Sequence, residues 1–103
     1  MAGYTYLWEF KVKPEHVAEF QQQYGPHGLW VALFRKATGY VETLLLQDRG
    51  NPLRFITIDR WQSADAHRSF RAACAREYAE LDARCAHLTT QELALGEFDE
   101  AVV

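Results

Sequence analysis

The sequence has 103 residues, of which 49% are hydrophobic and 14% aromatic. This length and composition suit one small domain, so we expect residues 1–103 to form a single unit with an ordered core. The formal net charge of −3 comes from 11 basic and 14 acidic residues spread along the chain, which argues against a nucleic-acid partner. No apolar run is long enough to cross a membrane and no signal peptide is visible, so we expect a cytoplasmic protein.

The first third of the chain predicts one strand and two short helices. In Tyr4–Val12 every second side chain is large and apolar, which is typical of a strand with one buried face. Pro14 suits the first turn of a helix that ends at Gly25. A second helical pattern follows after Gly28 and closes at Gly39.

The remainder predicts a hairpin, a long helix and a last strand. Strands are expected at Tyr40–Gln47 and Leu53–Trp61, joined by turn-forming residues. Ser63 can cap the following helix, whose apolar residues recur at helical spacing and which can break near Arg76. The last strand covers roughly residues 90–98, and Gly96 within it indicates a bulge.

This order, β-α-β-β-α-β, predicts an α+β fold of ferredoxin-like topology, with helices on one face of a four-stranded antiparallel sheet. Large apolar side chains occur on both sides of the strands, as with Tyr6 and Trp8 against Leu7 in the first strand. The face without helices is then apolar and needs a partner. We therefore expect a homodimer that forms through this face.

The cysteines and histidines predict neither a disulfide nor a metal site. Cys74 and Cys85 lie 11 residues apart in a predicted helix, about 16 Å along its axis. That distance exceeds the reach of a disulfide, so both are expected to be buried thiols. No cysteine motif or pair of histidines has the spacing of a metal site.

Short motifs along the chain resemble the antibiotic biosynthesis monooxygenase family. The strand ending DRW, followed by QSADAHRSF, is similar to that family's strand-to-helix signature. The opening YLWEFKVKPEHVAEF resembles its first strand and helix, and Gly39-Tyr40 resembles the start of its second strand. The resemblance implies a dimeric α+β barrel, with two sheets packed face to face and a ligand cavity between each sheet and its own helices.

The same family includes oxygenases that oxidise quinols and polycyclic phenols without metal or flavin, as well as haem-degrading enzymes. Trp8 stands where the haem-degrading members have an asparagine, which disfavours haem. Phe70 stands where other members often have a histidine. In quinol-oxidising members a tyrosine lies near the position of His67. The resemblance thus implies no cofactor.

Oxygenation without a cofactor needs a group that takes the substrate proton and a dry aromatic cavity. His67 is the candidate proton acceptor because imidazole titrates near neutrality, and Trp61 is the candidate stacking wall. A solvent-exposed helix histidine and a core tryptophan are the alternatives. Further aromatic residues are expected to bind the substrate, or else to be simple core: Trp8, Tyr24, Trp30 and Phe34.

Asp59 precedes Trp61 near the end of a predicted strand. A carboxylate that points into the sheet interface would need a cationic partner. We expect Asp59 to pair with Arg54 or with an arginine of a second subunit.

Two functions follow from the sequence. The first is a cofactor-independent monooxygenase that acts on a phenolic or quinol-like small molecule. The alternative is a non-catalytic dimeric domain that binds a small hydrophobic or aromatic molecule or serves a structural role. A cavity that contains a titratable group would favour the first.

Overall fold

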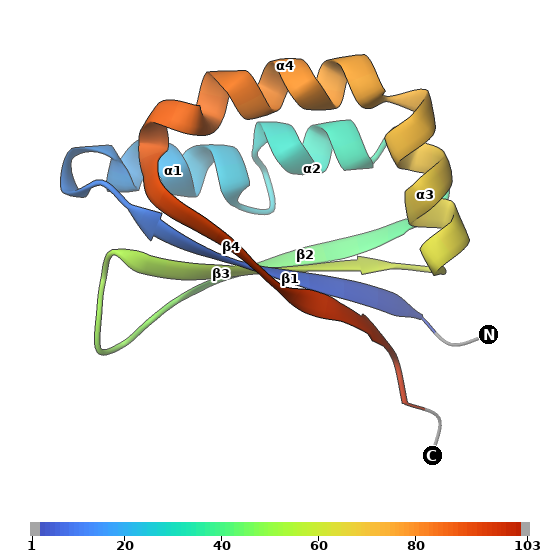
Figure 1. Ribbon diagram of the computed structural model, residues 1–103, viewed down its shortest axis with the longest axis horizontal. Coiled ribbons are helices and arrows are strands. Elements are labelled where there is room, and N and C mark those ends of the chain that lie inside the picture. The colour runs from blue at the N-terminus through green and yellow to red at the C-terminus, as the bar shows by residue number, and fades with distance from the viewer. Residues whose placement is uncertain (1–2, 102–103) are drawn as a thin grey trace.

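The computed structural model describes residues 3–101 of the chain. Its elements follow the predicted β-α-β-β-α-β order, with each helical segment divided in two (Figure 1). They are β1 (Tyr4–Val12), the 3₁₀ turn η1 (Pro14–His16), α1 (Val17–Tyr24), α2 (Leu29–Phe34), β2 (Tyr40–Gln47), β3 (Arg54–Trp61), α3 (Ala64–Ala73), α4 (Ala75–Cys85), the 3₁₀ turn η2 (Ala86–Leu88) and β4 (Thr89–Asp99). Within this part of the chain, no helix is long and apolar enough to cross a membrane.

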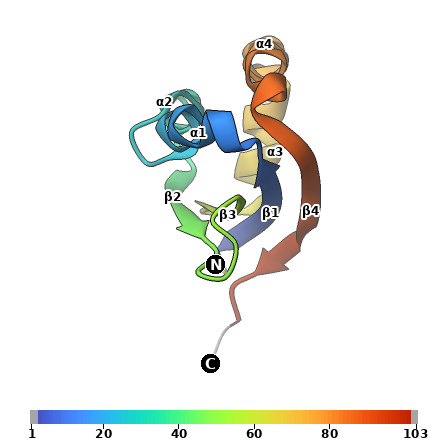
Figure 2. The ribbon, with the colours of Figure 1, turned by 90° about the vertical axis from the view of Figure 1, so that its left-hand side faces the viewer.

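The four strands form one antiparallel sheet in the order β2-β3-β1-β4. The helices gather on one face of this sheet, and no helix of residues 3–101 covers the other face (Figures 1 and 2). This is the ferredoxin-like α+β architecture that the element order predicts. We call the helix-covered face the inner face and the other the outer face.

The core lies between the inner face and the helices. In β1 the residues of one parity are aromatic or branched, and Tyr4, Tyr6 and Phe10 are each less than 10% exposed. They pack against helix residues such as Phe20 and Phe70, which are almost completely buried. Burying a side chain of this size contributes about 1.5–3 kcal/mol to stability, so the alternation in β1 accounts for much of the contact between the layers.

Helix α1 ends at Tyr24, directly before the predicted stop at Gly25, whereas α2 ends earlier than the sequence predicts. Helix α2 stops at Phe34 rather than at Gly39, because the N–H groups of Lys36 and Ala37 bond to carbonyls three residues back and tighten the chain into turns. The long helix breaks at Cys74, two residues before the break considered near Arg76, and the φ of −113° and ψ of 24° at Cys74 are not helical. Figure 1 shows α3 inclined steeply toward the sheet, whereas α4 runs across the top of the molecule.

The predicted bulge at Gly96 is confirmed. Pairing shifts between Leu7 and Trp8 of β1, so that Gly96 and Ala94 face consecutive residues and Leu95 is extra. Gly96 has a φ of +147°, which a residue with a Cβ adopts only with strain. The bulge changes which side chains of β4 point inward. Glu97 consequently shares the inner face.

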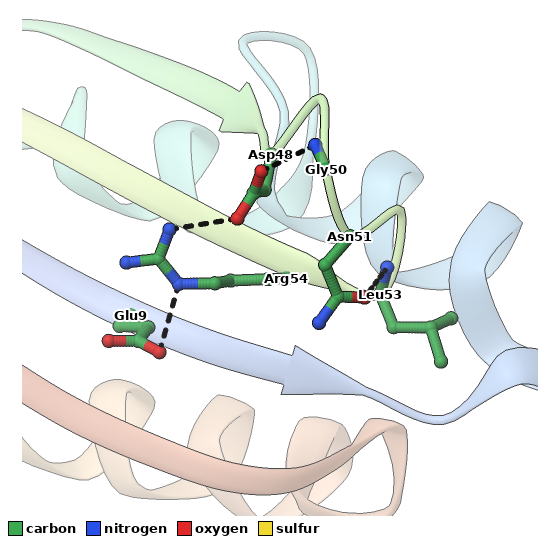
Figure 3. A network of polar contacts seen from close by, with 6 residues as sticks. All are labelled: Glu9, Asp48, Gly50, Asn51, Leu53 and Arg54. Atoms are coloured by element: carbon green, nitrogen blue, oxygen red, sulfur yellow. Dashed lines mark hydrogen bonds and ion pairs between the residues drawn. The ribbon is translucent and has the colours of Figure 1, made fainter.

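The expected ion pair between Asp59 and Arg54 is wrong. The two residues are five positions apart in one strand, so they point to opposite faces. On the outer face the Arg54 guanidinium instead binds Glu9 and Asp48, each at 3.1 Å, as Figure 3 shows. Asp48 also accepts the N–H of Gly50 at 2.7 Å, so its carboxylate joins the hairpin loop to the start of β3.

The outer face has an apolar centre and charged ends. Aligned aliphatic side chains from all four strands form the centre: Leu7, Leu44, Leu46, Ile56, Ile58 and Leu93. Leu44 is 44% exposed in the single chain. At one end lies the pair Arg54–Glu9, and at the other Arg60 binds Glu42 and Glu100. An apolar centre with a polar rim is the usual composition of a protein interface.

We expect the protein to be a dimer that buries this outer face, with a total interface above ~1,200 Å². Sedimentation at micromolar concentration should give twice the mass of the chain. Leu44→Glu should give a monomer, because it places a charge in the apolar centre. Leu29→Glu is the matched control, since Leu29 is similarly exposed but lies on α2. A native monomer at this concentration would exclude the dimer.

Candidate functional site

A cavity of about 390 Å³ lies between the inner face and the helices. Its walls are mainly aromatic: Tyr6, Trp8, Phe10, Tyr24, Trp30, Phe34 and Tyr78. Thr43, Thr57 and Asp59 supply the polar groups of its floor, and all three are buried. Arg71 and Asp82 also line the cavity but are exposed, so they mark its mouth beside α3 and α4.

The four predicted substrate-binding residues line this one cavity. Trp30 is central among them, with its ring centroid 5.9 Å from that of Tyr24 and 6.0 Å from that of Phe34. It also meets Tyr78 edge to face at 4.9 Å. The aromatic wall of the cavity is thus built from α1, α2, α4 and the sheet. Their binding role remains a prediction.

A smaller cavity of about 280 Å³ adjoins the larger one. The two share Tyr6, Trp8 and Arg71 as lining residues. His67 and Glu97 line only the smaller cavity. The exposed guanidinium of Arg71 is therefore available to a ligand in either one.

His67 is half-buried rather than exposed, because α3 inclines toward the sheet. Its ring lies 4.7 Å from that of Tyr6, 5.5 Å from that of Tyr4 and 5.1 Å from that of Trp61, measured between centroids. Its Nε2 atom is buried and has no hydrogen-bond partner among the described residues. Burial, helped by the positive charge of Arg71, lowers the pKa of His67 to about 4. The imidazole is consequently neutral at pH 7.

Trp61 lines neither cavity and is only 1% exposed. Its ring packs edge to face against Phe34, Tyr40 and His67. No face of the indole is open to a ligand in the chain as it stands. Trp61 therefore supports His67 from behind, as a core residue does.

Asp59 lies on the inner face, not at the sheet interface where the sequence predicts it. It is 5% exposed, and its Oδ1 accepts a hydrogen bond of 2.6 Å from the Thr43 hydroxyl. The Tyr40 hydroxyl in turn donates to Thr43 at 2.8 Å. Burial raises the pKa of Asp59 to about 6, although the hydrogen bonds from Thr43 and Tyr6 oppose the rise. A signal was available, since Asp59 has the same parity as Phe55.

A possible metal-binding group lies outside both cavities. His16, Glu19 and His87 bring ligand atoms within 4.8 Å of one another. Spacing in the sequence missed them because His87 is distant along the chain. The Glu19 carboxylate contacts both imidazoles, His16 at 3.6 Å and His87 at 3.3 Å, and between 29% and 50% of each side chain is exposed. This donor set suits zinc, but none of the three residues lines a cavity.

Comparison with family models gives one match, described as antibiotic biosynthesis monooxygenase, over residues 4–80. The matched segment contains β1 to β3, α3 and the first half of α4, and thus most of the cavity walls. No curated protein sequence is significantly similar to the chain.

Solved structures with the same fold cover nearly the whole chain. A variant of SnoaB, a cofactor-independent oxygenase from Streptomyces nogalater, is 23% identical with a TM-score of 0.79, over 98% of this chain and 95% of that one. A proposed antibiotic biosynthesis monooxygenase from Deinococcus radiodurans is 16% identical with a TM-score of 0.76, over 97% and 94%. Another from Bordetella bronchiseptica is 18% identical with a TM-score of 0.74, over 99% and 100%. At these identities the likeness establishes the fold.

Stability should depend on pH in opposite ways through Asp59 and His67. The folded state holds more protons than the unfolded state on Asp59 between pH 4 and 6, so this group makes stability fall as the pH rises. His67 holds fewer protons in the folded state between pH 4 and 6.5, so it makes stability rise. For Asp59 the change is on the order of 3 kcal/mol.

Urea unfolding from pH 4.5 to 6.5 separates the two groups. Relative to the native protein, Asp59→Asn should gain stability as the pH rises, because only the His67 contribution remains. His67→Gln should lose stability over the same range. Variants that keep the native pH dependence would show that neither pKa is shifted.

Proposed function

The chain belongs to the antibiotic biosynthesis monooxygenase family, and from this we propose that it is a cofactor-independent monooxygenase of a small phenolic or quinol-like molecule. The observation that carries the proposal is the aromatic cavity itself, with a buried carboxyl on its floor and a neutral imidazole beside it. A family alone does not decide an activity, so the chemistry of the cavity has to support it.

The chemistry of phenol oxidation needs no separate electron donor. In the overall reaction a phenol and O₂ give a quinone and water, so one oxygen atom enters the ring and the other leaves as water. The ring supplies all four electrons that O₂ accepts, because it loses two hydrogen atoms and gains a second carbonyl. The sequence prediction of no cofactor agrees with this balance.

The cavity suits a flat aromatic substrate in size and lining. Its volume of about 390 Å³ falls in the range of small-molecule sites. Tyr24, Trp30 and Phe34 offer ring surfaces for stacking, and their burial keeps water away from a reactive intermediate. Arg71 at the mouth offsets negative charge that develops on the substrate oxygen.

His67 has a proposed role as a neutral hydrogen-bonding group. Its buried Nε2 atom has no hydrogen-bond partner in the described part of the chain, and a substrate hydroxyl in the smaller cavity would be that partner. Trp61 contributes by holding the imidazole in place from the core. This role differs from a strong base, because a group with a pKa of about 4 binds a proton weakly at pH 7.

We also propose that the enzyme acts as a cytoplasmic homodimer. The apolar centre of the outer face supports the dimer. The thiols of Cys74 and Cys85, both free and buried, are consistent with a reducing compartment.

Oxygen uptake tests the proposed function. With a panel of hydroquinones and polycyclic phenols, the purified protein should consume one O₂ per quinone formed, without added flavin and in the presence of EDTA. Binding of these phenols without oxygen uptake would instead support the non-catalytic domain.

The contribution of His67 is tested with a second histidine as the control. His67→Ala should lower kcat/KM by about 10- to 100-fold, the effect of removing one hydrogen bond of about 1.4–2.7 kcal/mol to the reacting molecule. His27→Ala should have no effect, since His27 is exposed and lines neither cavity. Equal activity of the two variants would remove His67 from the site.

A further inference from the structure

Asp59 occupies the floor of the larger cavity, in the second half of β3. The sheet register places it between Tyr6 of β1 and Thr43 of β2, with its side chain on the inner face. Both neighbours are buried and line the same cavity. A ligand that enters the cavity therefore meets Asp59 together with two hydroxyl groups.

The carboxylate of Asp59 has no cationic partner among the residues that the structure describes. Within residues 3–101 none of the ion pairs involves it, and the basic residue that lines this cavity, Arg71, lies exposed at the mouth. Burying an unpaired carboxylate is unfavourable, so proteins keep such groups mainly where they are used. Packing alone would be served better by an apolar side chain.

The acceptor capacity of Asp59 is only partly filled. A carboxylate can accept about four hydrogen bonds. Asp59 receives one from Thr43, at 2.6 Å to Oδ1, and interacts with the Tyr6 hydroxyl. Tyr40 donates to Thr43 and so fixes the direction of the Thr43 hydroxyl. The carboxylate is held in place and still has room for a hydroxyl group of a ligand.

We propose that Asp59 is the catalytic proton acceptor of the cavity, and that Thr43 is the residue that positions it. This step rests on the proposed oxygenase function. The Asp59 carboxylate forms an O–H bond to the phenolic proton as the phenol O–H bond breaks, which leaves a phenolate and a neutral carboxylic acid. The phenolate then carries the negative charge that the electron transfer to O₂ requires. Asp59 is a stronger base than His67, as the pKa values of about 6 and about 4 indicate.

Several titratable groups surround Asp59, and the experiments must distinguish their titration from that of Asp59. They are Tyr6 of β1, Tyr40 of β2, Tyr78 and Asp82 of α4, Arg71 of α3 and Glu92 of β4. Burial raises the pKa of each of these tyrosines, so they stay neutral below pH 8. Burial also raises the pKa of Glu92. Glu15 is an exposed carboxylate that lines neither cavity, which makes Glu15→Gln the matched control for Asp59→Asn.

A binding experiment tests the contact without turnover. The probe is 4-nitrophenol, whose phenolate absorbs visible light whereas the phenol does not. Beside the Asp59 carboxylate the bound probe should keep its proton to a higher pH, since two anions in contact repel each other. In Asp59→Asn the probe should ionise at least one pH unit lower than in the native protein. Glu15→Gln should leave the ionisation of the probe at the native pH.

The rate of oxygen uptake tests the proton transfer. The native rate should rise with pH through about 6, as the carboxylate form appears. Asp59→Asn should lower the rate by about 10²–10⁴-fold and remove this rise. Thr43→Val should move the rise to higher pH, because the lost hydrogen bond no longer lowers the pKa of Asp59, and Thr43→Ser should restore it.

The two experiments fail in different ways. Oxygen uptake with the same pH profile in Asp59→Asn would overturn the role of Asp59 while the oxygenase function stands. A probe whose ionisation is the same in Asp59→Asn and the native protein, or a native protein that does not bind the probe, would also overturn it. The expected probe shift without oxygen uptake would support the contact and reject the oxygenase.

Discussion

The two-residue period of the strands divides this sheet into an aromatic face and an aliphatic face, and the rest of the structure depends on that division. On the inner face, β1 carries Tyr6, Trp8 and Phe10, whose rigid rings meet the aromatic residues of the helices. Rings of this size do not fill the layer completely, and a cavity remains between them. On the outer face the same period aligns Leu44 and Ile58 into a surface suited to a second subunit.

The break between α3 and α4 completes the site. Because the helix ends at Ala73 and restarts after Cys74, α3 inclines toward the sheet while α4 runs across the top of the molecule (Figure 1). Tyr78 and Asp82 of α4 line the larger cavity. This inclination brings His67 against Tyr6 and places Arg71 at both cavities. The bulge at Gly96 has a similar effect on β4, since it turns Glu97 inward beside the smaller cavity.

The strands and the aromatic wall could be predicted because their signal is local. Alternation in Tyr4–Val12 and the turn residues after Gln47 depend on neighbours in the sequence, and the observed bounds agree closely. Trp30 and Phe34 were expected at the cavity because their spacing marks one helix face. The ends of helices are less predictable from the sequence. After Phe34 the chain continues in turns, because the N–H groups of Lys36 and Ala37 bond to carbonyls three residues back and not four.

The chemistry of the site depended on contacts between distant residues. The sequence predicts an ion pair for Asp59 at the sheet interface, whereas the structure buries Asp59 with hydroxyl groups only. The pKa of His67 follows from the aromatic rings and Arg71 around it, which no spacing reveals. His16 and His87 meet only because η1 and η2 are adjacent in the fold.

The central claim is that the phenolic substrate itself reduces O₂ inside the aromatic cavity. Turnover under ¹⁸O₂, with the product analysed by mass spectrometry, tests this most directly. The account predicts one ¹⁸O atom in each quinone, the other in water, and the same yield from protein treated with EDTA and freed of flavin. A quinone without the label, or a yield that depends on added flavin or metal, would contradict it.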